Sequence, residues 1–76
     1  MTQNDNCLKE FGKLVRQRRR SLDISQQELA NIIEVHRSWI GRVEKGTTNP
    51  SLVTMMKICK GLNCSVLDLM PENKKE

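Results

Sequence analysis

The sequence predicts a small all-α domain of five helices. Apolar residues recur every three or four positions along most of the chain, as on one face of an α-helix, and no segment alternates convincingly as a strand does. The 76 residues suffice for one domain with a modest core, which must be mostly aliphatic because Phe11 and Trp39 are its only Phe, Trp or Tyr residues. We expect one compact domain over residues 1–76, with its core at about 8–70, a loose N-terminus (1–5) and a loose C-terminal tail.

The charge balance narrows the class of partner. Thirteen Lys and Arg residues against nine Asp and Glu residues give a net charge of +4. Such a surplus favours polyanions, either nucleic acid or an acidic membrane surface, although solubility alone would also explain it. No apolar run approaches the roughly 20 residues of a membrane span, and no targeting segment is visible. We therefore expect a cytoplasmic protein without a membrane partner.

The reactive side chains do not form an enzyme site. Cys7, Cys59 and Cys64 make an odd count that suits neither a disulfide framework nor a zinc site, since only one His accompanies them. Paired carboxylates, a nucleophile–His pair and a glycine-rich phosphate loop are absent from the sequence. We expect no metal, no cofactor and no catalysis, and we interpret Cys59 as a small buried hydrophobe.

The first two helices have clear sequence signals. The first is predicted over residues 6–21, and Arg18–Arg20 are interpreted as its solvated end, where cations suit the helix dipole. Its apolar stripe consists of Leu8, Phe11, Leu14 and Val15. The second is predicted over residues 26–33, because Ser25 can act as its N-cap and Glu28 completes a capping box.

Three further helices follow. The third is predicted over residues 37–45, with His36 at its cap position and Gly46 supplying the left-handed residue that ends it. The fourth is predicted over residues 51–62. Its apolar stripe consists of Leu52, Met55, Ile58, Cys59 and Leu62. A short fifth helix is predicted to start at Ser65.

Helices two and three are joined by only about three residues, which forces a steep crossing of the helix-turn-helix type. Ala30 supplies the small residue that a close crossing needs, while Ile40 and Val43 pack inward. The opposite face of the third helix is then free, and it carries Arg37, Ser38, Gly41, Arg42 and Lys45. A helix held in this way can enter the major groove of B-DNA, where its leading residues meet the base edges.

The predicted base contacts lie at and behind this leading end. Arg37 can form a bidentate pair with guanine, and Ser38 can donate or accept a hydrogen bond. His36 flanks them. It either contacts a base or a phosphate, or lies on the surface without a contact. Arg42, one turn further on, can reach a base or a phosphate, or remain solvated.

These residues resemble a known family. The segment from Phe11 to Leu69 is similar to the phage repressor and Cro-type helix-turn-helix domains, with the motifs SQQELA, IGRVEKG, NPSL and KICKGLNCS in the family's order. Within that family, HRSWIGRVEKGTTNPSLV most resembles the controller proteins of restriction–modification systems. The resemblance implies a lambda-repressor-like fold that binds double-stranded DNA.

The resemblance also implies roles for single residues. Together with the exposed end of the third helix, it assigns phosphate contacts to Gln26, Trp39, Lys45, Asn49 and Ser51. It implies a salt bridge from Arg16 to Glu44 that links the first helix to the third. Two positions depart from the family: Glu34 stands where a Gly is common, at an expected strain of about 1 kcal/mol, and His36 replaces the usual capping residue.

The fifth helix has more apolar residues than its own anchoring needs. A single DNA-reading helix contacts too few base pairs to be selective. A dimer places two such helices on half-sites about 34 Å apart and so reads enough base pairs. We therefore predict a two-fold homodimer through Leu62, Val66, Leu67 and Met70.

These observations lead to one functional expectation. We expect a sequence-specific transcriptional regulator that binds a palindromic operator near a promoter and recruits or blocks RNA polymerase, most specifically the controller of a restriction–modification operon. A phage-type repressor or an antitoxin is the alternative within this class. A helical protein-interaction module without DNA binding is the alternative outside it.

Overall fold

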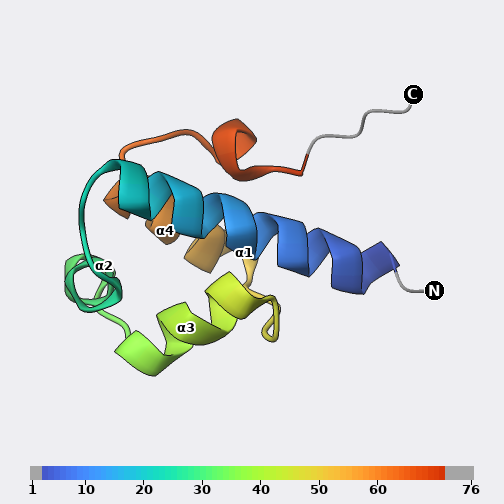
Figure 1. Ribbon diagram of the computed structural model, residues 1–76, viewed down its shortest axis with the longest axis horizontal. Coiled ribbons are helices and arrows are strands. Elements are labelled where there is room, and N and C mark those ends of the chain that lie inside the picture. Colours follow the sequence, from blue (N-terminus) through green and yellow to red (C-terminus); the bar gives the residue numbers. More distant parts are fainter. Residues whose placement is uncertain (1–2, 72–76) are drawn as a thin grey trace.

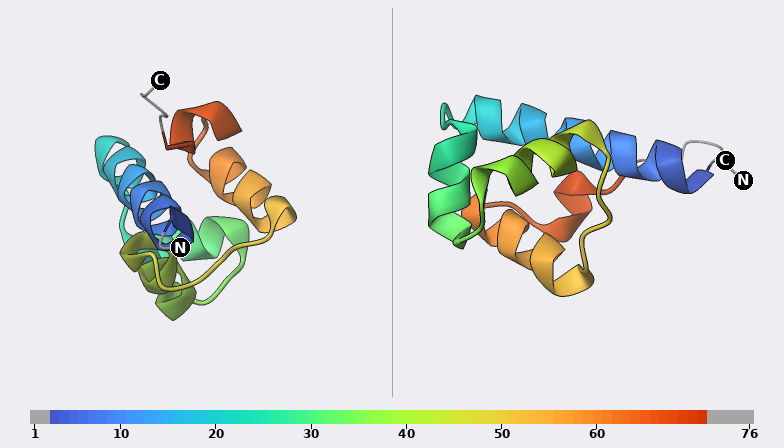
Figure 2. Two further views of the ribbon diagram at one scale, coloured as in Figure 1. Left: turned by 90° about the vertical axis from the view of Figure 1, so that its right-hand side faces the viewer. Right: turned by 90° about the horizontal axis from the view of Figure 1, so that it is seen from below.

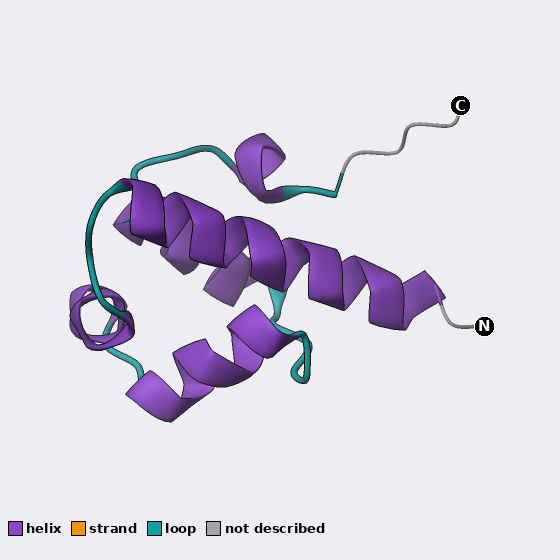
Figure 3. Cartoon of the chain, in the orientation of Figure 1, coloured by secondary structure: helices purple, strands orange, loops and turns teal. Residues whose placement is uncertain are grey.

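The computed structural model describes residues 3–71 and shows four α-helices followed by one short 3₁₀-helix. The elements are α1 (Gln3–Ser21), α2 (Gln26–Ile33), α3 (Arg37–Lys45), α4 (Leu52–Gly61) and η1 (Val66–Leu69). Helices and loops account for the whole described range, and no strand occurs in it (Figure 3). The predicted all-α class and the helix-turn-helix pair α2–α3 are confirmed.

The prediction of five α-helices is wrong, because the last element is a single 3₁₀ turn. Met70 has already left the helical region, with φ −80° and ψ 135°. Pro71 follows it, and a proline disfavours the α conformation in the residue before it. Only a few residues therefore lie between the start of the segment at Ser65 and its enforced end.

The ends of the chain differ partly from expectation. α1 begins at Gln3, so residues 3–5 are helical where the sequence analysis predicted a loose segment. Residues 1–2 and 72–76, which include most of the predicted loose tail, lie outside the described residues.

The elements are arranged around α1, the longest helix. Figure 1 shows α3 below α1 and η1 above it, and the left view of Figure 2 shows α4 beside α1. α3 packs chiefly against α1, while α2 packs against both α3 and α4. Every element contributes at least one buried apolar side chain to the core, and those at its centre are Val15, Leu29, Ala30, Ile40, Val43, Ile58 and Leu69.

The predicted helix boundaries around the turn are confirmed by their caps. The Ser25 hydroxyl accepts from the Glu28 amide at 3.0 Å, and the Glu28 carboxylate accepts from the Ser25 amide at 2.7 Å. Glu34 ends α2 in the left-handed region at φ 60°, and Gly46 ends α3 there at φ 76°. Together these caps make α2 and α3 short helices with a fixed joint between them.

One close approach was not anticipated from the sequence. A Cβ atom on Gly12 would overlap the backbone carbonyl oxygen of Val43 and would lie 2.7 Å from that of Glu44. No side chain fits there, so Gly12 allows α1 to contact the last turns of α3 directly. The position of α3 therefore depends on a glycine in the first helix.

The three cysteines are free thiols. Cys59 is buried in the core, which confirms its interpretation as a small hydrophobe. Burial raises the pKa of the Cys59 thiol to about 11, with a further contribution from the neighbouring Cys64. This thiol is therefore protonated near neutral pH.

Candidate nucleic-acid interface

α3 presents one buried and one exposed face. Ile40 and Val43 are buried almost completely, and both belong to the core. The opposite face carries the exposed side chains of Arg37, Ser38, Arg42 and Lys45, with the half-buried Gly41 between them. In the right view of Figure 2, α2 and α3 lie in front of the rest of the molecule, and nothing covers α3 from that side. The predicted outward face is confirmed.

The leading end of α3 brings the three predicted reading residues together. His36, Arg37 and Ser38 line one shallow hollow with Gln27 and Val35. His36 occupies the N-cap position in an extended conformation, but its side chain makes no capping hydrogen bond. Its Nδ1 instead lies 3.2 Å from the Ser38 hydroxyl oxygen. The side chain of the cap residue therefore leaves the first amides of α3 available to another acceptor.

A chain of hydrogen bonds runs from α1 to Arg37. Arg19 donates to both carboxylate oxygens of Glu44, with Nε–Oε2 at 2.7 Å and Nη2–Oε1 at 3.0 Å. Glu44 Oε1 also accepts from the Gln26 side chain at 3.1 Å, and Gln26 Oε1 accepts from Arg37 at 3.2 Å. We call these four residues the polar relay. It fixes the orientation of Gln26 and Arg37 from the buried side of α3.

The predicted salt bridge between Arg16 and Glu44 is wrong by one turn of α1, because the partner of Glu44 is Arg19. Gly12, Val15 and Arg19 lie three and four residues apart and share the stripe of α1 that faces α3. Arg16 falls outside that stripe and is exposed. The hydrogen bond to Glu44 raises the pKa of Arg19 despite its burial.

The prediction of a solvated end for α1 is therefore wrong in part, because two of its three arginines bond to other parts of the protein. Arg19 is buried, and its Nη1 also donates to the Ile24 carbonyl at 2.9 Å. Arg18 donates to the carbonyl oxygens of Leu62 and Asn63, at 3.0 and 2.9 Å, just beyond the end of α4. Their position three and four residues after the buried Val15 was the signal that could have revealed them.

Known proteins share this arrangement. The helix-turn-helix family matches residues 15–69 of the chain.

The chain belongs to the helix-turn-helix family.

Its relatives include restriction–modification regulators. The helix-turn-helix protein described here is 42% identical to the control protein C.BamHI of Bacillus amyloliquefaciens over 71 residues, which cover 92% of this chain and 85% of that one. The crystal structure of the restriction–modification controller protein C.AhdI from Aeromonas hydrophila matches with a TM-score of 0.81 and 35% identity, covering 83% of this chain and 96% of that one. The predicted family and its resemblance to controller proteins are confirmed.

A third likeness shows the fold alone. The controller protein C.Esp1396I, solved as a tetramer in complex with its natural 35 base-pair operator, matches with a TM-score of 0.75 at 24% identity. The match covers 80% of this chain and 82% of that one.

The candidate phosphate contacts of this helix-turn-helix protein lie on both sides of the reading face. Gln26 is at the first position of α2, and its amide nitrogen has a second hydrogen beyond the one given to Glu44. Lys45 is exposed in the last turn of α3, and Asn49 is exposed in the loop that follows it. The Ser51 hydroxyl caps α4 by accepting from the Thr54 amide at 3.2 Å, a role the sequence analysis did not assign.

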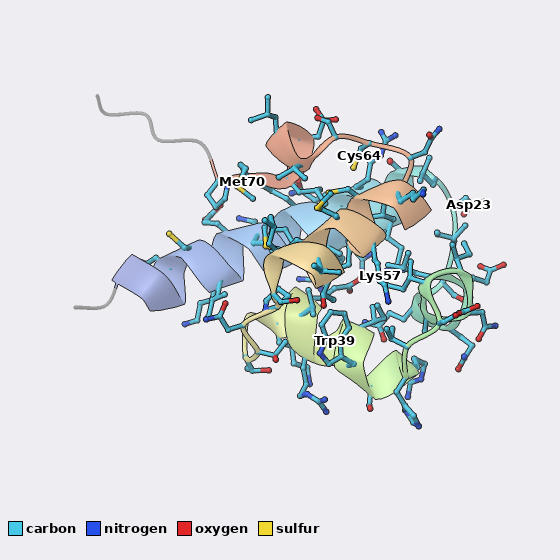
Figure 4. The ribbon with its side chains drawn as sticks, turned by 180° about the vertical axis from the view of Figure 1, so that it is seen from behind. Asp23, Trp39, Lys57, Cys64 and Met70 are labelled. Atoms are coloured by element: carbon cyan, nitrogen blue, oxygen red, sulfur yellow. The ribbon has the colours of Figure 1, made fainter. Side chains whose placement is uncertain are left out.

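Trp39 is half-buried and packs at the edge of the core. In Figure 4, which shows the molecule from behind, Trp39 lies on α3 on the side that faces the viewer, as α4 does. Its predicted contact with the DNA backbone remains a prediction.

The candidate dimer residues differ in exposure. Leu62 is fully buried, so its assignment to a subunit interface is wrong. It continues the Met55–Ile58 stripe of α4 at helical spacing, which places it inside the protein's own core. Leu67 is 82% exposed, and Val66 and Met70 are half-buried.

An apolar groove lies next to these residues. It runs between α4 and the segment leading into η1, and the apolar side chains of Val53, Met56 and Val66 contribute to its lining. Val53 and Met56 are more than half exposed on α4. The apolar surface around η1 therefore extends onto α4.

The described residues contain neither a membrane-spanning helix nor a metal cluster. None of the helices in the described range combines the length and the apolar character that crossing a bilayer requires. Among the described residues, no three His, Cys, Asp or Glu side chains cluster as a metal site does.

Proposed function

We propose that this protein is a sequence-specific regulator of transcription that reads double-stranded DNA through α3 and controls a restriction–modification operon. The observation that carries the proposal is the exposed leading end of α3, where Arg37 is oriented by the polar relay. The 42% identity to the control protein C.BamHI supports the restriction–modification assignment.

The geometry of α3 suits the major groove. Its inner face is anchored by Ile40 and Val43, so its outer face can enter a groove about 12 Å wide without loss of core contacts. Arg37 uses one guanidinium nitrogen on Gln26 and keeps other donors for the acceptor edge of a guanine. Ser38 and His36 then lie against neighbouring base edges, and Arg42 lies one turn further into the groove.

Phosphate contacts frame this reading face. The DNA backbone around the reading face would be held by Gln26, Trp39, Lys45, Asn49 and Ser51. Such contacts position a protein on DNA without reading its sequence. Binding near a promoter would recruit or block RNA polymerase, and the protein would act in the cytoplasm beside the operon's DNA.

The active form in this proposal is a two-fold homodimer on a palindromic operator. Val66, Leu67 and Met70 form the interface, joined by Val53 and Met56 on α4 in place of the buried Leu62. η1 and α3 lie on opposite sides of α1 (Figure 1), so an interface at η1 leaves the reading helices uncovered. The proposal requires no catalytic step and no cofactor.

Duplex binding across a salt series tests the proposal. A fluorescently labelled random-sequence duplex is titrated with protein at several salt concentrations, and the anisotropy is measured. We expect binding that weakens steeply, by about 10³-fold or more between 50 and 200 mM salt if six or more phosphates are contacted. Absence of duplex binding at low salt would favour a protein-interaction module instead.

A further inference from the structure

A row of exposed cations follows α1 on the side next to α3. Lys9, Lys13, Arg16 and Arg20 lie four, three and four residues apart, so they share one face of the helix and are all exposed. These three intervals together extend over about 16 Å along the helix axis. With Lys45 of α3 they line one groove between the two helices, which we call the basic groove.

The positive charge of the chain is concentrated in this groove. Its lining contains six basic residues and one acidic residue, which gives the lining a net charge of +5. Since the whole chain carries +4, all residues outside the lining together carry −1. The one acidic residue is Glu44, which is buried and already paired with Arg19. The exposed cations of the groove therefore face solvent, and the one carboxylate among the lining residues is already paired with Arg19.

The groove begins where the reading face ends. Gln26 and Gly41 belong both to its lining and to the border of the exposed face of α3. Gly41 leaves this border low, since a Cβ atom there would have its nearest neighbour, Gln26 Oε1, 4.0 Å away. A duplex held against α3 would therefore bring one of its backbones over the groove.

We propose that Lys9, Lys13 and Arg16 bind the phosphate backbone of the duplex beside the segment that α3 reads. The inference rests on the proposed function, and it gives Arg16 a role outside the salt bridge that the sequence analysis expected. Phosphates repeat every 3.4 Å of helix axis along each strand, so the row from Lys9 to Arg16, about 10 Å long, is matched to several of them. These contacts supply affinity and carry no sequence information.

The test compares two double variants that lose the same charge. Lys13→Gln/Arg16→Gln removes two cations of the basic groove, and Lys57→Gln/Lys60→Gln removes two exposed cations of α4. Binding of each to the same duplex is measured across a salt series, with helicity by circular dichroism confirming that both variants fold. Each phosphate contact contributes about 0.9 to the slope of log affinity against log salt concentration.

We expect the groove variant to lose about 2 from this slope per bound protomer and to bind about 10- to 100-fold more weakly at 0.1 M salt. Its preferred base sequence should not change, and the α4 variant should keep the slope of the unmodified protein. Equal slopes for both variants, with steep salt dependence in the unmodified protein, would overturn the inference and leave the proposed function standing. An unmodified protein that fails to bind any duplex would overturn both.

Discussion

Arg37 is held by a neighbour rather than left free on the surface. Its hydrogen bond to Gln26, which in turn bonds to Glu44, connects the reading residue to the buried Arg19 of α1. A long side chain loses rotamer entropy when it binds, and prior orientation reduces that loss. The polar relay is therefore a structural link, and in the proposed function it would also orient Arg37 toward a base.

Removing Arg37 tests the reading role. Arg37→Ala should cost about 1–3 kcal/mol of binding free energy on the preferred operator and should relax selectivity at one base pair. The measurement is a titration of the preferred duplex and of duplexes with single substitutions. Arg42→Ala is a useful comparison, since it removes the same charge from the next turn. An unaltered base preference in Arg37→Ala would exclude a reading role.

Arg16 and Arg19 are expected to contribute very differently to stability, because Arg19 and not Arg16 pairs with Glu44. Arg19→Ala strands the buried Glu44 carboxylate and should lower the free energy of unfolding by about 3–5 kcal/mol. Arg16→Ala removes an exposed side chain and should change it by no more than about 0.5 kcal/mol. Urea denaturation of both variants decides between them, and a large loss in Arg16→Ala alone would contradict the observed pairing.

These residues show what the sequence could and could not predict. The outward face of α3 followed from the spacing of Ile40 and Val43, because helical periodicity determines which side chains share a face. The partner of Glu44 could not be predicted, because Arg16 and Arg19 both lie within reach of α3 as long as the exact position of α3 against α1 is unknown. In the structure, the close approach of Gly12 to the backbone of α3 goes together with the register of α1 that places Arg19 against Glu44.

At the scale of elements, the short helices are defined mainly by their ends. The Ser25 capping box, the left-handed Glu34 and the left-handed Gly46 delimit α2 and α3. The first and the last were visible in the sequence, whereas the turn at Glu34 was indicated only by the resemblance to the family. The last element was not visible in the sequence, because a capping signal at Ser65 says where a helix starts and not how far it continues. There Asp68 accepts from both the amide and the hydroxyl of Ser65, which lowers the pKa of Asp68.

Glu34 offers a test of strain in the turn. A residue with a Cβ atom costs roughly 1–2 kcal/mol in the left-handed region, and glycine avoids that cost. Glu34→Gly should therefore be more stable than Glu34→Ala by about 1 kcal/mol, although both lose the same carboxylate. Thermal unfolding of the two variants measures the difference. Equal stability would mean that the turn is not strained at this position.

At the scale of the whole molecule, the reading face and the proposed interface are separate. α3 lies on one side of α1 and η1 on the other, while α4 occupies the flank between them (Figures 1 and 2). The sequence indicated surplus apolar residues near the C-terminus, but it could not show that Leu62 is fully buried in the protein's own core. Helical spacing puts Leu62 on the apolar stripe of α4, and the packing of α4 determines which residues of that stripe are buried: Ile58, Cys59 and Leu62 are, whereas Leu52 is exposed.

A charge placed in the proposed interface should dissociate the dimer. Leu67→Asp should give monomers in sedimentation experiments, because an unpaired carboxylate in an apolar interface is costly to desolvate. Ile32→Asp is the matched control: Ile32 is also an exposed apolar residue, but it lies on α2, away from η1. Dimers that persist in Leu67→Asp would place the interface elsewhere.

Selection of bound sequences from a random duplex pool tests the central claim most directly, since it asks whether α3 reads bases as one of a symmetric pair. The unmodified protein should enrich a palindrome whose half-sites are centred about 34 Å, or roughly ten base pairs, apart. A pool that remains unenriched after repeated rounds, although the protein still retains duplex DNA, would contradict it.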